Sequence, residues 1–292
     1  MWRNRGLTIE QYADLCARSP IGAAFAPEVV LYYFSRIGVP PRFVGLHDRS
    51  GALVGAFPSL YRVVFPSAMH KRLLGKRAAA LGDLGQPEAL FPVLPEARGL
   101  ALNHLSPITS PLLAGRVRSV TRRSLRRMAI AKERKHKKLS SRARAFTQEG
   151  GTAHFIEDLS PREFADVYLD LFCRRWNYPV SDYVDVREQI VALHAHLHGT
   201  LLMMKGEPVA AQLCCRHANS QLYYVDFINA GVQKTDDNTV SFGSIMMLLS
   251  LRRAEEQAKA RGVPLRFSFG FTYTDSDYKA VWADPEPTFI GI

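Results

Sequence analysis

Residues 200–229, TLLMMKGEPVAAQLCCRHANSQLYYVDFIN, decide the fold of this chain. Three apolar runs rich in Leu, Val, Tyr and Cys are separated here by two short polar turns, Gly-Glu and Ala-Asn-Ser. Apolar runs with tight turns between them are typical of neighbouring antiparallel strands. The stretch therefore predicts a three-stranded meander. Its strands are expected at residues 200–205, 209–217 and 221–229.

A long helix and one further strand are expected after the meander. Residues 240–261, VSFGSIMMLLSLRRAEEQAKAR, predict the helix, which Gly262 caps and Pro264 prevents from continuing. Residues 265–269 then predict a strand. A helix between two strands of one sheet forms a right-handed crossover and makes the strands parallel. The fold class is therefore expected to be α/β with a mixed sheet.

The composition is that of a globular protein with enough apolar residues for a core. Of the 292 residues, 47% are hydrophobic and 22% are charged. The sequence contains no run of about 18 apolar residues, which is the length that a membrane-spanning helix needs. No apolar run follows the basic N-terminus, as it would in a secretory signal. The four cysteines have neither zinc spacing nor a C-x-x-C pair, so we expect reduced thiols and a cytoplasmic protein.

One basic segment accounts for the net charge of +11. Residues 116–144 contain 13 of the 38 basic residues and one of the 27 acids, so the rest of the chain is nearly neutral. Because no Pro or Gly interrupts residues 116–148, we expect a helix. Its charge suits an anionic lipid or other anionic ligand, nucleic acid, or plain solvation of a helix that covers the sheet. The candidate anion-binding residues are Arg122, Arg123, Arg126, Arg127, Lys137 and Lys138.

The chain is expected to form two halves, residues 1–115 and 116–292. The first half predicts two helices and three strands, at residues 8–18, 27–38, 42–47, 52–57 and 60–65. Residues 66–115 are rich in Pro and Gly and have no convincing periodicity. The second half adds helices at residues 160–176 and 184–198 to the meander and the crossover.

The start of the long helix is a candidate binding site for a donor substrate or a phosphate. The first turn of a helix presents unpaired N–H groups and a partial positive charge. Gly243 would let a ligand approach the backbone beside Phe242, and the hydroxyls of Ser241 and Ser244 can donate hydrogen bonds. The alternative is that Ser241 only caps the helix and Gly243 only packs closely.

The closing segment, residues 267–282, is a second candidate because polar and aromatic residues follow the last predicted strand there. Lys279 could stabilise a developing oxyanion, and an Asp of this segment could act as a base. The alternative is a surface loop whose aromatic residues pack on the core.

Three histidines, His194, His196 and His198, lie at the end of a predicted helix. In a helix only the outer two share a face, and no Glu lies between them as in a metalloprotease helix. The run therefore favours a helix end, and no metal site is predicted.

The chain resembles FemAB-like and GNAT-type acyltransferases in the order of several short motifs. The basic segment with its closing glycines resembles the element that opens the second half of these enzymes. The Phe-Ser-Phe-Gly strand with the later Tyr-Lys pair resembles their closing signature. The motifs lie at residues 51–58, 137–151, 174–176, 205–211, 267–270 and 278–282. The resemblance implies a GNAT-like fold of two tandem halves. It also implies that an acyl-CoA or an aminoacyl-tRNA is the donor, with the basic segment suited to tRNA.

The basic middle and the ending YKAVW at residues 278–282, followed by Asp284 and Pro285, are similar more narrowly to the Mig family of macrophage-inducible antimicrobial-peptide-resistance proteins. The similarity spans about the whole length. It implies a role in bacterial resistance to cationic peptides and peripheral association with the inner membrane. Within it, Lys279 would steady the tetrahedral oxyanion, while Tyr278 and Asp277 would handle protons.

One departure concerns the loop before the long helix. Acetyl-CoA-using GNAT enzymes carry an Arg/Gln-x-x-Gly-x-Gly/Ala loop there, whereas residues 233–243 keep only Gly243 and place two acids before the helix. Three hypotheses follow. The chain is an acyl- or aminoacyl-transferase in peptide resistance, a non-catalytic GNAT-fold protein that binds anionic lipid through residues 116–144, or a DNA-binding transcriptional regulator.

Overall fold

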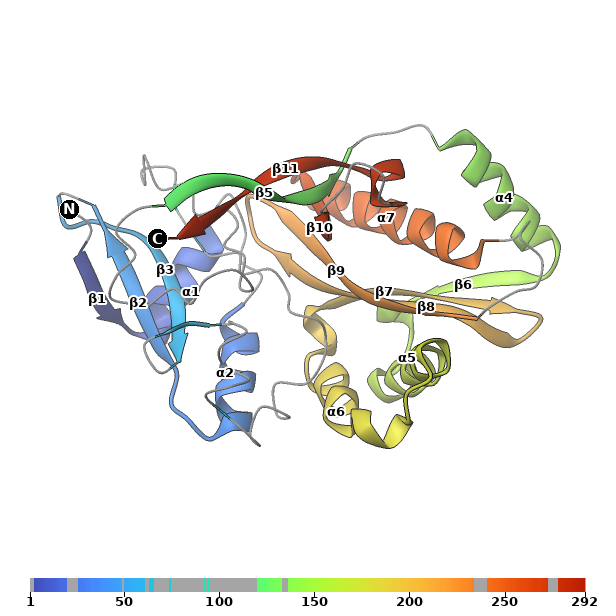
Figure 1. The fold of residues 1–292 in the computed structure, drawn as a ribbon, viewed down its shortest axis with the longest axis horizontal. Coiled ribbons are helices and arrows are strands. Elements are labelled where there is room, and N and C mark those ends of the chain that lie inside the picture. Colours follow the sequence, from blue (N-terminus) through green and yellow to red (C-terminus); the bar gives the residue numbers. More distant parts are fainter. Residues whose placement is uncertain are drawn as a thin grey trace.

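The chain folds into two lobes that lie side by side (Figure 1). The smaller lobe contains the N-terminal strands and helices, and the larger lobe contains the long sheet and the C-terminal helices. The computed structural model describes residues 3–19, 26–48, 50–60, 63–65, 74, 92, 94, 120–132, 136–233, 241–272 and 278–291. Most of residues 66–115, for which the sequence predicts no regular structure, lie outside the described residues.

The smaller lobe is a four-stranded antiparallel sheet with two helices. Its strands, in order across the sheet, are β1 (Arg3–Leu7), β2 (Arg42–His47), β3 (Leu53–Leu60) and β4 (Val63–Val64). The helices are α1 (Ile9–Arg18) and α2 (Pro27–Ile37). The predicted capping box at Thr8 begins α1, and Gly38 ends α2 with φ of +67°, as the sequence predicts. The sequence pattern does not predict β1.

The larger lobe is built on a mixed seven-stranded sheet with the order β11-β5-β10-β9-β8-β7-β6. Its strands are β5 (Val120–Ala131), β6 (Gly151–Phe155), β7 (Leu197–Met204), β8 (Glu207–Ala218), β9 (Tyr223–Val232), β10 (Leu265–Thr272) and β11 (Ala283–Gly291). Its helices are α4 (Lys137–Gln148), α5 (Pro161–Trp176), α6 (Val184–Ala192) and α7 (Phe242–Ala260), with short 3-10 turns η2 (Ile156–Asp158), η3 (Val180–Tyr183), η4 (His194–His196) and η5 (Tyr278–Val281).

The meander and the crossover of the sequence analysis are confirmed. Strands β7, β8 and β9 are consecutive antiparallel neighbours, and α7 leads from β9 to β10. β10 pairs with β9 in parallel. The mixed α/β fold class is therefore correct.

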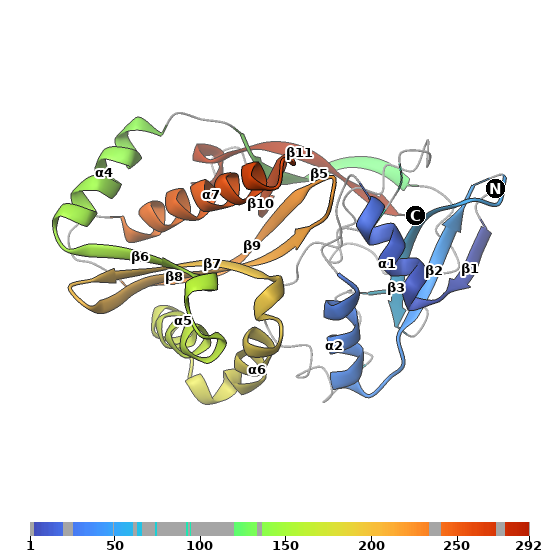
Figure 2. The ribbon, with the colours of Figure 1, turned by 180° about the vertical axis from the view of Figure 1, so that it is seen from behind.

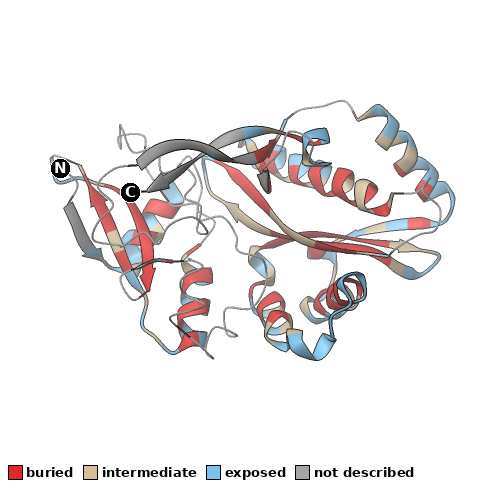
Figure 3. Cartoon of the chain, in the orientation of Figure 1, coloured by how far each residue is buried: buried red, intermediate tan, exposed pale blue. Residues whose placement is uncertain are grey.

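Helices cover both faces of the larger sheet (Figure 1). Leu201 and Leu202 are neighbours in β7, so their side chains point to opposite faces. Leu202 belongs to the core with α7 and α4, whereas Leu201 belongs to the core with α5 and α6. Figure 3 shows the buried residues of α7 and α5 along the sides of these helices that face the sheet.

The two lobes also share an apolar core at their junction. Leu193, Leu222 and Tyr224 of the larger lobe pack with buried residues of α1 and α2, and Tyr224 is fully buried. Arg36 of α2 adds ion pairs to Asp185 (2.6 Å) and Glu188 of α6. Figure 2 shows α1 and α2 on the side of the smaller lobe that faces the larger lobe.

The prediction of one helix over residues 116–148 is wrong. Residues 120–131 form β5, which pairs with β10 on one side and β11 on the other, and only residues 137–148 form a helix. Absence of Pro and Gly permits a strand as well as a helix, and the ladder bonds to two neighbours override a weak helix propensity. The basic segment is thus a strand of the sheet followed by a separate helix.

Two further boundaries differ from the prediction. β11 is an additional strand beyond the one expected to be last; its Pro285 and Pro287 hide it in the sequence but are tolerated because β11 is an edge strand. The helix expected over residues 184–198 ends at Ala192, and His198 lies in β7. The last part of that segment is extended because it pairs with β8.

Gly231 of β9 is expected to be essential for packing. A Cβ at this position would lie 2.5 Å from the carbonyl carbon of Leu171 and closer still to the amide nitrogen of Phe172, both backbone atoms of α5. We expect Gly231→Ala to lower the free energy of unfolding by roughly 1–3 kcal/mol, since helix and strand must separate. Urea denaturation measures the loss.

The matched control is Gly243→Ala, where the nearest atom to the new Cβ is Val232 Cγ2 at 3.7 Å, an ordinary contact. This variant should be as stable as the unsubstituted chain. Equal stability of both variants would contradict the close packing of β9 on α5.

Candidate functional site

β9 and β10 part from one another inside the larger sheet. β9 and β10 pair with each other as far as Asp226 and Ser268, and the described residues beyond this point do not pair across the two strands. β10 bulges at this point, where its register with β5 shifts between Ser268 and Phe271. Gly270 takes φ of +74° in the bulge, and its N–H donates to Ser268 Oγ (3.1 Å). The bulge turns β10 away from the end of β9.

The first turn of α7 lies beside the parting strands. Ser241 caps the helix: its hydroxyl accepts from the Ser244 N–H (3.3 Å) and lies 2.9 Å from the Ser244 hydroxyl. Phe242 is buried and packs edge-on against Phe146 of α4 (6.0 Å between ring centroids). A Cβ at Gly243 would meet only Val232 Cγ2, at an ordinary contact distance of 3.7 Å.

A cavity of about 360 Å³ opens between the first turn of α7, the far half of β9, the end of α5 and η5. Its volume is in the range of small-ligand sites. The described residues that line it are Arg175, Trp176, Phe227, Asn229, Ala230, Val232, Ser241, Gly243, Ser244, Met246, Met247, Tyr278 and Trp282. The lining therefore combines aromatic and thioether side chains with a helix N-terminus. We call this cavity the splay cavity.

Of the residues predicted from sequence, the splay cavity brings together Ser241, Gly243, Ser244 and Tyr278. Phe242 is separated from the cavity because its side chain belongs to the core. The two candidate segments, although far apart in the chain, thus meet at one place.

Arg175 and Trp176 also line the cavity, although the sequence singles them out only within the motif at residues 174–176. They end α5, where the Arg175 guanidinium donates to the Ala230 carbonyl (3.4 Å) and lies 5.2 Å from the centroid of the Trp176 ring. Among the described lining residues, Arg175 has the only charged side chain. One signal could have indicated Arg175 and Trp176. Trp176 is a large apolar residue at the end of α5, whose other large apolar residues are buried.

The remaining catalytic candidates lie near β10. Tyr278 is 57% exposed, at the edge of the splay cavity. Lys279 is not among the lining residues; its Nζ would lie 3.8 Å from a Cβ on Gly270, next to the bulge. Asp277 lies outside the described residues.

The candidate anion-binding residues fall in two elements. Arg122, Arg123, Arg126 and Arg127 belong to β5, whereas Lys137 and Lys138 are exposed in the first turn of α4. They do not form one continuous helical face as expected.

The three histidines are dispersed by the end of α6. His198 is buried in β7 with its Nε2 3.1 Å from both the backbone oxygen and the hydroxyl oxygen of Ser250, while His194 and His196 lie in η4. Burial lowers the pKa of His198 to about 4, so its ring is neutral at pH 7. Within the described part of the chain, no group of three His, Cys, Asp or Glu residues could bind a metal ion.

In the described part of the chain, no helix has both the length and the apolar character that crossing a membrane requires.

The mixed sheet with its parting strands and the helix between them define the fold of the GNAT-like acyltransferases. The chain belongs to the Mig-14 family, whose model matches residues 26–290. A search of curated protein sequences found no match.

Several solved structures are similar to this chain. FemX has a TM-score of 0.52 at 11% sequence identity, over 94% of this chain and 90% of that chain, and so shares the fold. A tandem GNAT protein from the clavulanic acid biosynthesis pathway is similar over 99% of this chain and 97% of its own, with 12% identity and a TM-score of 0.43. L-PGS from Bacillus licheniformis matches 58% of this chain with 14% identity and a TM-score of 0.39, and this chain spans 60% of it.

Substitutions at Gly243 should block the splay cavity without harming the fold. The new methyl of Gly243→Ala meets only Val232 at 3.7 Å and projects beside lining atoms, whereas Leu would occupy far more space. We expect thermal stability to be kept and the affinity for a donor to fall stepwise from Gly to Ala to Leu. Titrations with acyl-CoAs and with aminoacyl-tRNA measure the affinity for the donor. Unchanged affinity in the Leu variant would rule out this cavity as the donor site.

Proposed function

We propose that this chain transfers an acyl or aminoacyl group to an amine at the cytoplasmic surface of the inner membrane, and so contributes to bacterial resistance to cationic antimicrobial peptides. The splay cavity is the observation that carries the proposal. Hydrogen-bond donors at the start of α7 lie beside an aromatic wall there, which suits a ligand with a polar carbonyl or phosphate end and an apolar body. Membership of the Mig-14 family and the FemX-like fold support the transferase class.

The proposed reaction needs an oxyanion stabiliser and a route for one proton. The amine lone pair attacks the donor carbonyl carbon, a C–N bond forms, and the carbonyl electron pair moves to oxygen. Collapse of this tetrahedral oxyanion breaks the bond to the leaving thiol or ribose oxygen. The proton lost by the amine ends on that leaving atom, so the products are an amide and a free thiol or hydroxyl.

The first turn of α7 binds the donor in this proposal. Its N–H groups, the Ser241 and Ser244 hydroxyls and the Arg175 guanidinium offer several donors to a phosphate or carbonyl oxygen. Lys279 steadies the oxyanion, and Tyr278 with Asp277 moves the proton. Because residues 233–243 lack the loop that binds the pyrophosphate of coenzyme A, an aminoacyl-tRNA fits better than an acyl-CoA.

Thermal stability against a panel of donors tests the proposed function. The panel contains acetyl-CoA, longer acyl-CoAs, aminoacyl-tRNA, duplex DNA and anionic lipid headgroups. A ligand at about 100 times its dissociation constant stabilises the native state by roughly 2.7 kcal/mol, which is a readable shift. A shift with an acyl-CoA or with tRNA supports the transferase and names its donor; shifts with lipid or DNA alone would overturn it.

Substitutions in η5 separate chemistry from structure. Tyr278→Phe removes one hydroxyl and Lys279→Met removes one charge, so each should lower kcat by roughly 10²-fold or more with little change in melting temperature. Val281→Ala is the control, since Val281 is 56% exposed in the same turn and does not line the splay cavity. Full transfer activity in both variants would remove the catalytic roles of Tyr278 and Lys279.

A non-catalytic lipid-binding protein is the second candidate, favoured by the missing pyrophosphate loop. Exposed aromatic side chains support membrane contact in either case: Trp176 and Tyr178 are 47% and 49% exposed next to Arg174 and Arg175. Trp and Tyr side chains prefer the membrane–water interface, and arginines favour anionic headgroups. The third hypothesis, a DNA-binding regulator, has no such support.

Charge reversal tests membrane association. Replacing Arg122, Arg123, Arg126 and Arg127 by Glu should reduce binding to phosphatidylglycerol vesicles at least 100-fold, because each basic residue near the surface contributes about 1 kcal/mol. Circular dichroism checks that β5 still forms. Lys259→Glu, in the last turn of α7, is the control. Unchanged vesicle binding would contradict a role for the basic segment at the membrane.

A further inference from the structure

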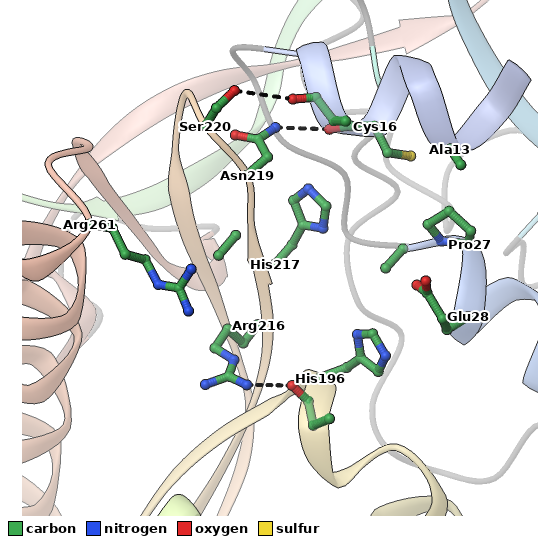
Figure 4. Close-up of a pocket in the computed structure, with 14 residues that line it drawn as sticks. Ala13, Cys16, Pro27, Glu28, His196, Arg216, His217, Asn219, Ser220 and Arg261 are labelled. Carbon is green, nitrogen blue, oxygen red and sulfur yellow. Dashed lines mark hydrogen bonds between the residues drawn. The ribbon is translucent and has the colours of Figure 1, made fainter. Parts of the chain in front are cut away.

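A second cavity, of about 500 Å³, lies at the junction of the two lobes (Figure 4). It is lined from the smaller lobe by α1 and the start of α2, and from the larger lobe by η4, the end of β8, the β8–β9 turn and Arg261 after α7. It shares no lining residue with the splay cavity. Ser241 lines the splay cavity and caps the start of α7, whereas Arg261 lines this second cavity and caps the end of α7. About 28 Å of helix therefore separates the two cavities. We call this second site the junction cavity.

The two lobes are joined by hydrogen bonds at the wall of the junction cavity. The Asn219 side-chain amide donates to the carbonyls of Cys16 (2.9 Å) and Ser19 (2.8 Å) at the end of α1. Its amide oxygen accepts from the backbone N–H groups of Gln221 (2.8 Å) and Leu222 (2.9 Å). A side chain used on both sides in this way fixes the wall before a ligand arrives, which lowers the cost of binding.

Opposite charges line the junction cavity without pairing. Figure 4 shows Glu28 of α2 on one side and the guanidinium groups of Arg216 and Arg261 on the other, with the rings of His196 and His217 between them. Among the described residues, Glu28, Arg216 and Arg261 form no ion pair. The Arg216 guanidinium instead donates to the Ala195 carbonyl.

The histidines add neutral hydrogen-bonding groups to the Glu28 side. Burial lowers the pKa of His217 to about 4 and also lowers the pKa of His196, so both rings are uncharged at pH 7. Glu28 favours the charged form of both rings, whereas Arg216 disfavours that of His196, which agrees with their places in the cavity. A neutral imidazole can accept a hydrogen bond from an ammonium group. No metal-binding group of three residues occurs here or elsewhere in the described ranges.

We propose that the junction cavity binds a small ligand with both charges, its ammonium group at Glu28 and its anionic group at Arg216 and Arg261. A purely anionic ligand would leave Glu28 beside a like charge, and a purely cationic ligand would face two guanidinium groups. The anion is a carboxylate, as in an amino acid, or a phosphate, as in an ethanolamine phosphate. This site is separate from the proposed transferase chemistry in the splay cavity.

Calorimetric titration of the full chain tests the site. The probes are ω-amino carboxylates from β-alanine to 8-aminooctanoate, which scan the distance between the charges, and phosphoethanolamine, which replaces carboxylate by phosphate. Hexylamine and hexanoate carry one charge each. We expect at least one doubly charged probe to bind tenfold or more tightly than either of these, and the better anion identifies the ligand class. Equal binding of singly and doubly charged probes would overturn the proposal.

Two variants assign the ends of the ligand. Glu28→Gln should weaken the best probe at least tenfold without changing hexanoate binding, and Arg261→Gln should weaken it without changing hexylamine binding. The matched controls are Glu163→Gln, in the first turn of α5, and Lys259→Gln, in the last turn of α7; neither residue lines the cavity. Loss of affinity in the controls, or none in Glu28→Gln, would overturn the proposal. Failure of the donor panel leaves these titrations unaffected, so the two proposals are tested separately.

Discussion

The parting of β9 and β10 is the constraint on which the functional architecture depends. β9 packs closely on α5, where Gly231 lies against the backbone of Leu171 and Phe172. β10 in turn is directed to β5 by the bulge at Gly270, whose N–H is satisfied by Ser268 rather than by β9. Contacts with α5 and with β5 thus position β9 and β10, and the start of α7 lines the opening between them. The splay cavity is a consequence of backbone geometry more than of its lining side chains.

The sequence predicted well where structure is decided locally. The meander, the crossover helix and the caps at Thr8 and Gly38 all follow from turns and terminal residues within a few positions. It failed where the decision is made by partners distant in the chain. β5 is extended because β10 and β11 lie on either side, and nothing within residues 120–131 records that.

The candidate site shows the same division. Ser241, Gly243 and Ser244 could be predicted because a helix N-terminus is a local feature with a known field. Arg175 and Trp176 reach the same cavity from the end of α5, some 65 residues earlier in the chain, and only the packing of α5 on β9 brings them there. The junction cavity was not predicted at all, because its charged residues come from parts of the chain that are far apart, namely α2, β8 and the residue that follows α7. The predicted division of the chain into two halves, between residues 115 and 116, stays a prediction.

The dipole of α7 gives a physical reason why the two cavities differ in charge. The splay cavity lies at the N-terminus of α7, where the helix itself contributes about half a positive charge, and the guanidinium of Arg175 adds a full one. The junction cavity adjoins the C-terminus, where the helix contributes a partial negative charge. An anion bound there would meet that field as well as the charge of Glu28, and the guanidinium groups of Arg216 and Arg261 oppose both. Arg261 also stabilises α7 from its C-terminal end, so an anion that binds it competes with the helix for the same charge.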